Sequence, residues 1–278
     1  MRRERNPLLS AYALIVYVFL FLPILILILF SFNDSKDNFA WTGFTLRWYP
    51  TLFANEDMLE SLLNTLKVAA VAVIASTVLG TLLGIGLARL RTRYVGALSE
   101  TLILLPMVAP EIILGLSLLL FFAQIFSANG SLGQISVAHI TFCVSYVAVV
   151  VRARALNLDP HIEEAARDLG ASAGGAFRYV TLPLLAPAIA AGAMLSFALS
   201  FDDLIVTVFN AGPGSSTLPL YLYSRIKFGV TPEINAVSTL IVGVTGVAIL
   251  LAWWVGQTRR QAPAELEDDD LDPMPAAP

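Results

Sequence analysis

Charged residues are scarce in this sequence. Only 14% of the 278 residues are Asp, Glu, Lys or Arg, whereas 57% are hydrophobic, and the mean hydropathy is +0.75. Soluble globular proteins carry about 25% charged residues, so this composition excludes that class. The alternating strands of about 10 residues that build a membrane barrel are absent as well. The sequence therefore predicts an all-α integral membrane protein, because a helix satisfies its own backbone hydrogen bonds within lipid.

Cysteine and histidine are nearly absent too. Cys143 stands alone inside an apolar run, which excludes a disulfide within the chain and favours a packing role. His139 and His161 are too few and too far apart for a metal cluster, and no His or Cys pair has the spacing of a zinc site. We therefore expect no metal site.

The sequence contains no Gly-Lys pair. A Walker A loop requires Gly-Lys before Ser or Thr, and none of the three lysines, Lys36, Lys67 and Lys227, follows a glycine. We therefore predict that the chain is not an enzyme, hydrolyses no ATP by this route and holds no cofactor. No nucleic-acid partner is expected.

Long apolar runs take up most of the chain. A helix needs about 20 apolar residues to cross the hydrocarbon layer, and six runs approach or exceed that length. They cover residues 11–32, 63–88, 97–123, 134–151, 186–209 and 236–256. Pro106 and Pro110 predict a bend in the third span near Glu111. We expect six transmembrane helices, the first of them a retained anchor.

The basic residues lie mostly on one side of these spans. That side holds Arg2, Arg3, Arg5, Arg89, Arg91, Arg93, Arg152, Arg154, Arg167, Arg178, Arg259 and Arg260. Because positive loops stay in the cytoplasm, we predict that both termini and residues 152–185 are cytoplasmic. Six acidic residues and several prolines in residues 257–278 predict a disordered cytoplasmic tail.

A polar segment at residues 163–183 interrupts the apolar runs. Asp159 and Pro160 are suited to begin a helix, and Gly170 suits the left-handed position at its end. The helix has one narrow apolar face, formed by Ile162, Ala165, Ala166 and Leu169. A second short helix is predicted from about Ser172 to Val180, running until Pro183 and Pro187 reset the chain.

The same segment contains a G-x-S-x-G pattern. Residues 170–174 match it by letter, with Ser172 as the possible nucleophile of a hydrolase. That elbow needs a strand before the serine and a helix after it. A helical pattern precedes Ser172 here, and no His or Asp partner is local. We therefore interpret Ser172 as a helix cap.

Spaced residues of the polar segment match a known pattern. Glu164-Ala165-Ala166 is followed after three residues by Gly170 and, after nine more, by Val180-x-Leu182-Pro183. This resembles the E-A-A-x3-G-x9-I-x-L-P loop of ABC importer permeases, with valine in place of isoleucine. In that family the loop forms coupling helices that sit in a cleft of a cytoplasmic ATPase. The resemblance assigns to ATPase coupling the residues Glu163, Glu164, Ala165, Ala166, Asp168, Leu169, Gly170, Leu182 and Pro183.

Further motifs resemble the spermidine/putrescine-type permeases, specifically the second of their two membrane subunits. They lie at residues 31–35, 139–143, 196–203, 212–220 and 232–233. The resemblance implies an anchor helix and outer loop at residues 1–61, a type I permease domain at 62–256 and the acidic tail beyond. It also implies a multi-pass protein of the bacterial inner membrane. The partners implied are two copies of an ABC ATPase carrying ATP and Mg²⁺, a paralogous permease subunit, an external solute-binding protein and a polyamine substrate.

Three acidic residues lie well inside predicted spans. Glu111 is in the third span, and Asp202 and Asp203 are in the fifth. A carboxylate at such depth costs roughly 2.5 to 3.5 kcal/mol, so each needs a cavity or a partner. No Lys or Arg occurs in those spans, so we expect no partner within them. A bound polycation, water or the sister subunit is expected to neutralise these acids, unless they are protonated.

Aromatic side chains complete the predicted substrate pathway. The faces of Phe201, Tyr221 and Tyr223 are suited to cation–π contact with an ammonium group. One alternative function remains open, an autonomous ion-coupled transporter of organic cations that uses the three acids as ion sites. Inverted repeats with broken helices would support that alternative, and no internal repeat is evident.

Overall fold

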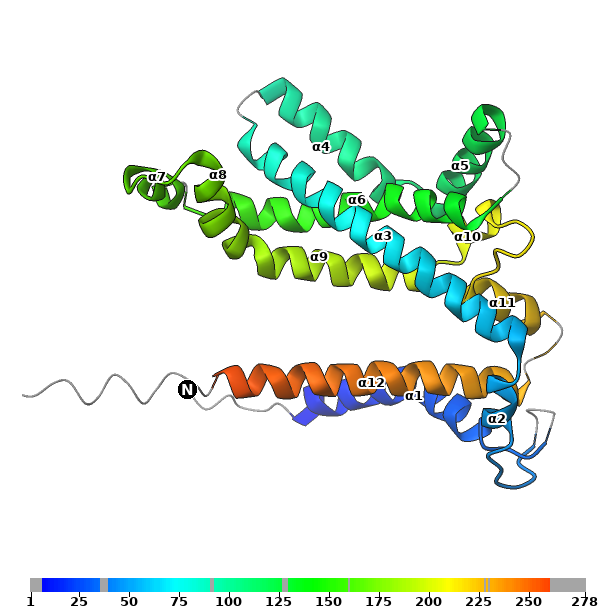
Figure 1. Ribbon diagram of the computed structural model, residues 1–278. Coiled ribbons are helices and arrows are strands. Elements are labelled where there is room, and N and C mark those ends of the chain that lie inside the picture. Colours follow the sequence, from blue (N-terminus) through cyan, green and yellow to red (C-terminus); the bar gives the residue numbers. More distant parts are fainter. Residues whose placement is uncertain are drawn as a thin grey trace, which may run out of the picture. The chain divides into compact units, whose positions relative to one another are not determined.

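Helices dominate the protein. The computed structural model describes residues 7–35, 40–90, 93–126, 130–159, 161–227, 229 and 231–260 (Figure 1). Within these residues the only β-type pairing is an isolated bridge between Asn33 and Phe44. The all-α prediction is therefore confirmed for the described part of the chain.

The described helices fall into two compact units. The helices are α1 (Pro7–Phe30), α2 (Trp48–Phe53), α3 (Glu56–Arg89), α4 (Arg93–Val108), α5 (Glu111–Phe126), α6 (Leu132–Leu156), α7 (His161–Asp168), α8 (Ala173–Ala176), the π-helix η1 (Phe177–Thr181), α9 (Leu182–Asp202), α10 (Ile205–Asn210), α11 (Leu218–Ile226) and α12 (Pro232–Arg260). One unit consists of residues 1–54 and 226–278, and the other of residues 55–225. The predicted domain limits at 61 and 256 stay a prediction.

In the first unit, α1 and α2 both contact α12. Between α1 and α2, the Asn33 side chain donates to the Ala40 carbonyl (2.7 Å) and accepts from the Thr42 amide (2.9 Å). The Trp48 indole donates to the Asn33 carbonyl at 2.7 Å. These bonds explain why the 31–35 motif carries an asparagine, a residue that both donates and accepts through one side chain.

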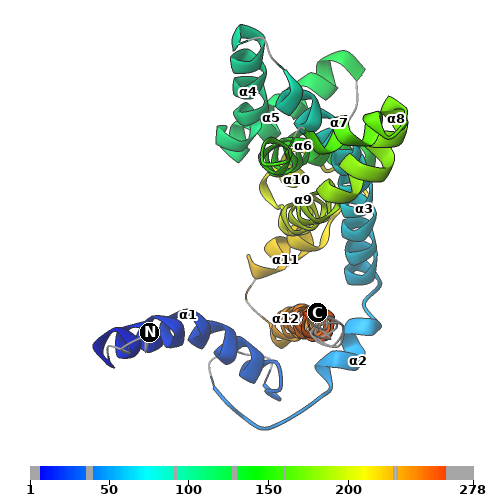
Figure 2. The same ribbon diagram turned by 90° about the vertical axis from the view of Figure 1, so that its left-hand side faces the viewer.

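In the second unit, α3, α6 and α9 pack against one another, with α3 crossing α6 and α9 (Figures 1 and 2). Glycines allow the close approach of α3 and α6. A Cβ atom at Gly80 would lie 2.6 Å from Val147 Cβ, and one at Gly84 would lie 2.7 Å from the Ala148 carbonyl oxygen. Small residues at such crossings let helices associate in lipid, where no hydrophobic force drives them together.

Gly84→Ala is expected to destabilise the protein by about 1 to 3 kcal/mol, because the added methyl group overpacks against backbone atoms of α6. Gly86→Ala is a matched control on the same helix, since no atom lies within 4 Å of a Cβ at Gly86. Thermal unfolding of the two purified variants measures the difference. Equal midpoints would contradict the proposed close contact.

The third predicted span is broken rather than gently bent. The predicted bend at Pro106 and Pro110 is confirmed. Helix α4 ends at Val108, α5 begins at Glu111, and the direction of the chain bends by 107° between the two helices. Pro110 has no N–H group, and its carbonyl accepts the first bonds of α5 from Ile113 (2.9 Å) and Leu114 (3.1 Å). Glu111 is therefore the first residue of a new helix at this break.

The helix observed at the fifth predicted span begins and ends at other residues than predicted. We expected Pro183 and Pro187 to interrupt the chain, but α8, η1 and α9 follow one another without a gap. Within η1 the Leu182 amide bonds to the Phe177 carbonyl, a π-type bond just before Pro183. Since proline excludes the carbonyl four residues earlier from an α-helical bond, the wider π-turn accommodates it. At the other end, α9 stops at Asp202, because Asp203 adopts an extended conformation (φ −66°, ψ 125°).

Four described helices are long and apolar enough to cross a membrane, and the bent pair of α4 and α5 raises the number to five. The four are Leu8–Phe30, Glu56–Arg89, Leu132–Leu156 and Ala173–Asp202. The apolar part of α12, Pro232–Val247, is shorter than a full span. A multi-pass helical protein follows from this, while the sixth span and the cytoplasmic placement of both termini stay predictions.

Candidate functional site

The polar segment forms a short helical hairpin at one end of the second unit. Its first helix, α7, begins after Asp159, whose carboxylate accepts from the His161 amide at 2.9 Å. Glu163 and Glu164 lie in the first turn of α7 and Arg167 in the last, as the helix dipole favours. The predicted capping role of Asp159 is confirmed, and Pro160 lies outside the described residues.

The turn between α7 and α8 has the predicted geometry. Gly170 has φ +91°, and its amide donates to the Arg167 carbonyl at 2.9 Å. The Ser172 hydroxyl accepts from the Gly175 amide at 3.1 Å, which makes Ser172 the N-cap of α8. Helix α7 precedes this serine, so the strand that a hydrolase elbow requires is not there. The interpretation of Ser172 as a cap is confirmed.

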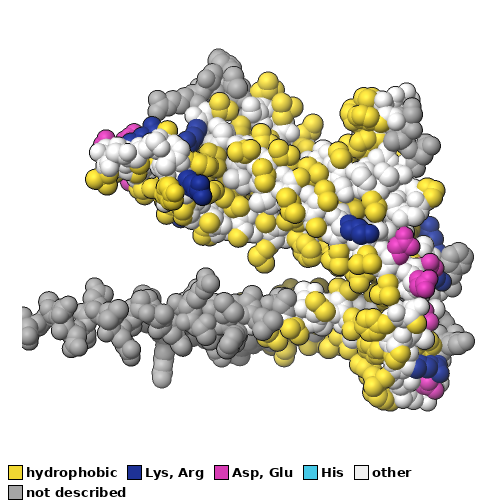
Figure 3. All heavy atoms as spheres, in the orientation of Figure 1, with side chains coloured by type: hydrophobic (Ala, Val, Ile, Leu, Met, Phe, Trp, Pro, Cys, Tyr) yellow, Lys and Arg dark blue, Asp and Glu magenta, His cyan; other side chains and the backbone are white. Residues whose placement is uncertain are grey.

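The hairpin exposes most of the residues predicted to couple to an ATPase. Glu164, Ala165, Asp168, Leu169, Gly170, Leu182 and Pro183 are exposed, while Glu163 and Ala166 are partly buried. Leu169 is 91% exposed, and α7 has no buried residue at all. Charged side chains gather at this end of the unit in Figure 3, whereas yellow hydrophobic side chains cover the adjoining stretch. A polar, lightly packed hairpin with an exposed leucine is suited to dock against another protein.

Glu163 differs from its neighbours in pointing toward the helix bundle. One of its oxygens, Oε2, accepts from Arg89 Nη2 of α3 at 2.6 Å and from Thr181 Oγ1 of η1 at 3.1 Å. The other oxygen accepts from Arg167 Nη2 of α7 at 2.9 Å. By contrast, Glu164 contacts only His161 among the described residues, at 3.1 Å, and its side chain is 69% exposed. The two adjacent glutamates thus have different surroundings.

The three acids predicted for the substrate pathway line one pocket of about 460 Å³ at the two helix breaks. Glu111 reaches it from the start of α5, Asp202 from the end of α9 and Asp203 from the link to α10. The remaining walls are mostly apolar, formed by Pro106, Met107, Ala109, Leu114, Phe142, Tyr146, Ala198, Leu199, Leu204, Ile205 and Val206. Residues 91 positions apart in the chain therefore face the same space.

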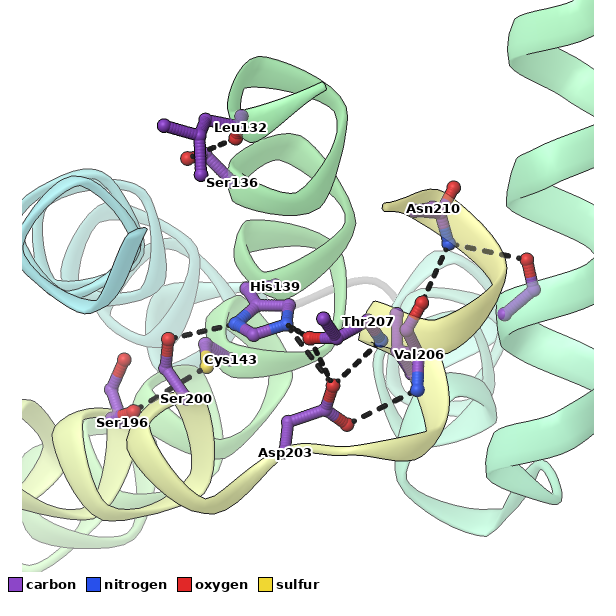
Figure 4. Close-up of polar contacts among 11 residues, drawn as sticks. Leu132, Ser136, His139, Cys143, Ser196, Ser200, Asp203, Val206, Thr207 and Asn210 are labelled. Atoms are coloured by element: carbon purple, nitrogen blue, oxygen red, sulfur yellow. Dashed lines mark hydrogen bonds and ion pairs between the residues drawn. The ribbon is translucent and has the colours of Figure 1, made fainter. Parts of the chain in front are cut away.

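Asp203 has partners within its own chain, which corrects the expectation that none exists. Its carboxylate lies 3.2 Å from His139 Nε2 and accepts from the Thr207 amide (2.8 Å) and hydroxyl (2.9 Å) and from the Val206 amide (3.3 Å) (Figure 4). The expectation was wrong because it considered only Lys and Arg, whereas a histidine of α6 supplies the donor. Asp203 thereby caps α10 and connects it to α6.

His139 is the residue at this site that the sequence analysis did not connect with the acids. Its ring is 1% exposed, and Nδ1 lies 2.8 Å from the Ser200 hydroxyl of α9 while Nε2 also lies 3.1 Å from Thr207 Oγ1 (Figure 4). The ring therefore connects α6, α9 and α10. A signal was present in the sequence, since His139 opens one of the recognised motifs and Ser200 and Asp203 lie in another.

Glu111 and Asp202 are in a different situation from Asp203. Neither carboxylate has a hydrogen bond or ion pair to any other residue that the structure describes. Asp202 is exposed, and Glu111 is exposed as well. Two unpaired carboxylates therefore face one largely apolar pocket, an arrangement that favours a cationic occupant.

The predicted aromatic residues do not line this pocket. Phe201 stacks on Phe197, with ring centroids 5.5 Å apart. The Tyr221 hydroxyl accepts from Asn55 at 3.1 Å, and the Arg225 guanidinium lies 5.1 Å from the centre of the Tyr221 ring. Tyr223 lies on the same helix, α11, and is 44% exposed. The structure thus brings the three acids together and leaves these three aromatics apart from them.

Membrane-length helices, an exposed hairpin and an acidic pocket at two helix breaks define a helical membrane transport protein. Residues 80–259 match the family described as the binding-protein-dependent transport system inner membrane component. The chain belongs to this family. Membership favours a permease of an ABC importer over an autonomous ion-coupled transporter, although the broken helices by themselves suit both.

Two kinds of relative support the assignment. The putrescine transport system permease protein PotI of Escherichia coli K12 is 41% identical over 257 residues, which are 90% of this chain and 91% of PotI. The spermidine/putrescine transport system permease protein PotC of Haemophilus influenzae is 36% identical over 245 residues, or 88% and 95% of the two chains.

Solved structures share the fold at low sequence identity. A bacterial ABC transporter involved in alginate import matches with a TM-score of 0.71 and 17% identity, over 93% of this chain and 97% of that one. The MetNI methionine ABC transporter matches with a TM-score of 0.57 and 20% identity, over 73% and 96%. The described helices thus adopt a fold found in ABC transporters.

Proposed function

We propose that this chain is a permease subunit of an ATP-driven importer and forms half of the translocation pathway for a polyamine. The observation that carries this proposal is the 41% identity to a putrescine permease over 90% of the chain. The 36% identity to spermidine/putrescine permeases points to the same substrate class. An external solute-binding protein delivers the polyamine, and a paralogous permease subunit supplies the other half of the pathway.

The acidic pocket supports a polyamine in particular. Glu111 and Asp202 each offer a carboxyl group without a partner among the described residues, and a polyamine carries separated ammonium groups with apolar methylene chains between them. Hydrogen bonds between ammonium and carboxylate groups are roughly twice as strong as neutral ones. The apolar walls suit the methylene chain. We therefore assign Glu111 and Asp202 to direct contact with the substrate. Asp203 instead stabilises the pocket through its hydrogen bonds to His139 and Thr207.

The exposed hairpin supports docking of an ATPase. In the proposed complex α7 and α8 of this chain enter a cleft on one ATPase, with Glu164, Leu169 and Gly170 at the contact. ATP and Mg²⁺ bind to the ATPase, of which the complex holds two copies, since the sequence of this chain lacks a Walker A loop. The complex lies in the bacterial inner membrane with the hairpin on the cytoplasmic side.

A substrate screen on the assembled transporter tests the proposal. Vesicles containing this chain and its partner chains are expected to hydrolyse ATP faster when the solute-binding protein is loaded with putrescine or spermidine. Loading with a neutral sugar or with alanine is expected to give no such stimulation, because neither places two cationic groups in the acidic pocket. Stimulation by a non-cationic solute alone would overturn the polyamine assignment while leaving the permease assignment intact.

A further inference from the structure

Helix α7 has little packing to hold it in place. None of its residues is buried, and a pocket of about 400 Å³ lies between α7 and the ends of α3, α6 and α9. Ile85 and Leu185 line the far side of this pocket, and Ile162 and Glu163 line the near side. Side chains that cross the gap must therefore set the position of α7 relative to the bundle.

The Glu163 side chain spans this gap. It is only 20% exposed and accepts from Arg89, the last residue of α3, from Thr181, the last residue of η1, and from Arg167 of α7 itself. One carboxylate thus joins α7 to η1 and to α3, which is far from both in the sequence. Arg89 is the last residue of the membrane-length helix α3, and Thr181 lies within the membrane-length stretch Ala173–Asp202, where η1 ends and α9 begins.

We propose that Glu163 is a positioning residue that ties α7 to α3 and α9, so that movement of the docked hairpin reaches both helices. This inference rests on the proposed function, in which an ATPase moves the hairpin. It assigns Glu163 a role distinct from that of Glu164. Glu164 faces solvent and is available to the ATPase, whereas Glu163 transmits the movement of the docked hairpin to α3 and α9.

Exchange of backbone amide hydrogens in the assembled complex tests the link without any substrate. Glu163→Gln and Arg89→Gln are each expected to speed exchange across residues 161–168 by about tenfold, because the carboxylate no longer restrains α7. Arg178→Gln is the control. Arg178 lies on η1 in the same hairpin, and its guanidinium contacts the Tyr179 ring (5.8 Å) rather than Glu163. Unchanged exchange in Glu163→Gln would overturn the link.

The ratio of polyamine imported to ATP hydrolysed tests the consequence for transport. Glu163→Gln and Arg89→Gln are each expected to lower this ratio by about 3- to 30-fold while ATP hydrolysis continues. The double variant is expected to be no worse than either single variant, because both changes break the same contact. Arg89→Lys, which keeps the positive charge, is expected to retain most of the ratio.

The possible results separate two failures. If the unmodified complex imports no polyamine, the proposed function fails, yet the exchange measurement still decides whether Glu163 restrains α7. If Glu163→Gln speeds amide exchange in α7 but leaves the ratio of polyamine imported to ATP hydrolysed unchanged, Glu163 restrains α7 without a role in coupling. That result would overturn the inference. Additive losses in the double variant would also overturn it, since Glu163 and Arg89 would then act independently.

Discussion

Asp202→Asn is expected to lower polyamine uptake at limiting substrate by roughly 10- to 100-fold, the effect of losing one charged hydrogen bond worth about 1.5 to 3 kcal/mol. Asp202 faces the acidic pocket and has no partner among the described residues, so its carboxylate is available to an ammonium group. Uptake of radiolabelled putrescine and spermidine into vesicles measures the effect. The amount of assembled transporter is expected to stay unchanged, because the Asp202 side chain makes no hydrogen bond or ion pair with any residue that the structure describes.

Two further variants make this test specific. Asp202→Glu keeps the charge and is expected to retain more uptake than Asp202→Asn. Asp203→Asn is expected to reduce the yield of assembled transporter instead, because both Asp203 oxygens accept hydrogen bonds and the amide would replace one of them by a donor. If Asp202→Asn and Asp203→Asn had the same effect on both uptake and yield, the division of roles between these adjacent acids would be wrong.

His139→Leu is expected to destabilise the protein by roughly 3 to 5 kcal/mol, the usual result of removing one partner from a buried pair. The Asp203 side chain is 7% exposed and would lose the His139 donor, and the Ser200 hydroxyl would lose the ring nitrogen 2.8 Å away. Both groups lie where α6, α9 and α10 meet. The yield of monodisperse transporter and its thermal midpoint in detergent measure the loss.

The second histidine of the chain provides the control. The His161 side chain is 80% exposed on α7, so His161→Leu is expected to change stability by no more than about 0.5 kcal/mol. His139→Gln is expected to recover part of the loss, since its amide can still donate toward Asp203. Equal thermal midpoints for His139→Leu and His161→Leu would show that the contacts of His139 contribute nothing to stability.

The hairpin was the part of the candidate site that the sequence predicted best. Asp159, Gly170 and Ser172 have the roles expected of them because caps and left-handed turns depend on the few residues beside them. The predicted interruption at Pro183 was wrong for a local reason as well. A π-turn removes the conflict that an ideal α-helix would have with proline, and residue type alone does not distinguish a break from a bulge.

The acidic pocket was predicted only in part. The low frequency of charge within apolar runs identified Glu111, Asp202 and Asp203, because an intramembrane carboxylate is costly wherever it lies. Their division into two unpaired acids and one bonded acid depends on His139, which is 64 residues from Asp203 in the sequence. Such a contact is created by the packing of α6 against α9 and α10, and no local pattern encodes it.

By itself, the sequence determined the membrane environment, the helical class, the resemblance to importer permeases and the local geometry of the hairpin. Composition and short-range periodicity are sufficient for these, since lipid permits few backbone structures and caps act over a few residues. Only the tertiary structure decided that Glu163 faces the bundle while Glu164 faces solvent, and that Asp203 is bonded while Asp202 is open. Adjacent residues of the same type differ because only one of each pair contacts a helix that is distant in the sequence.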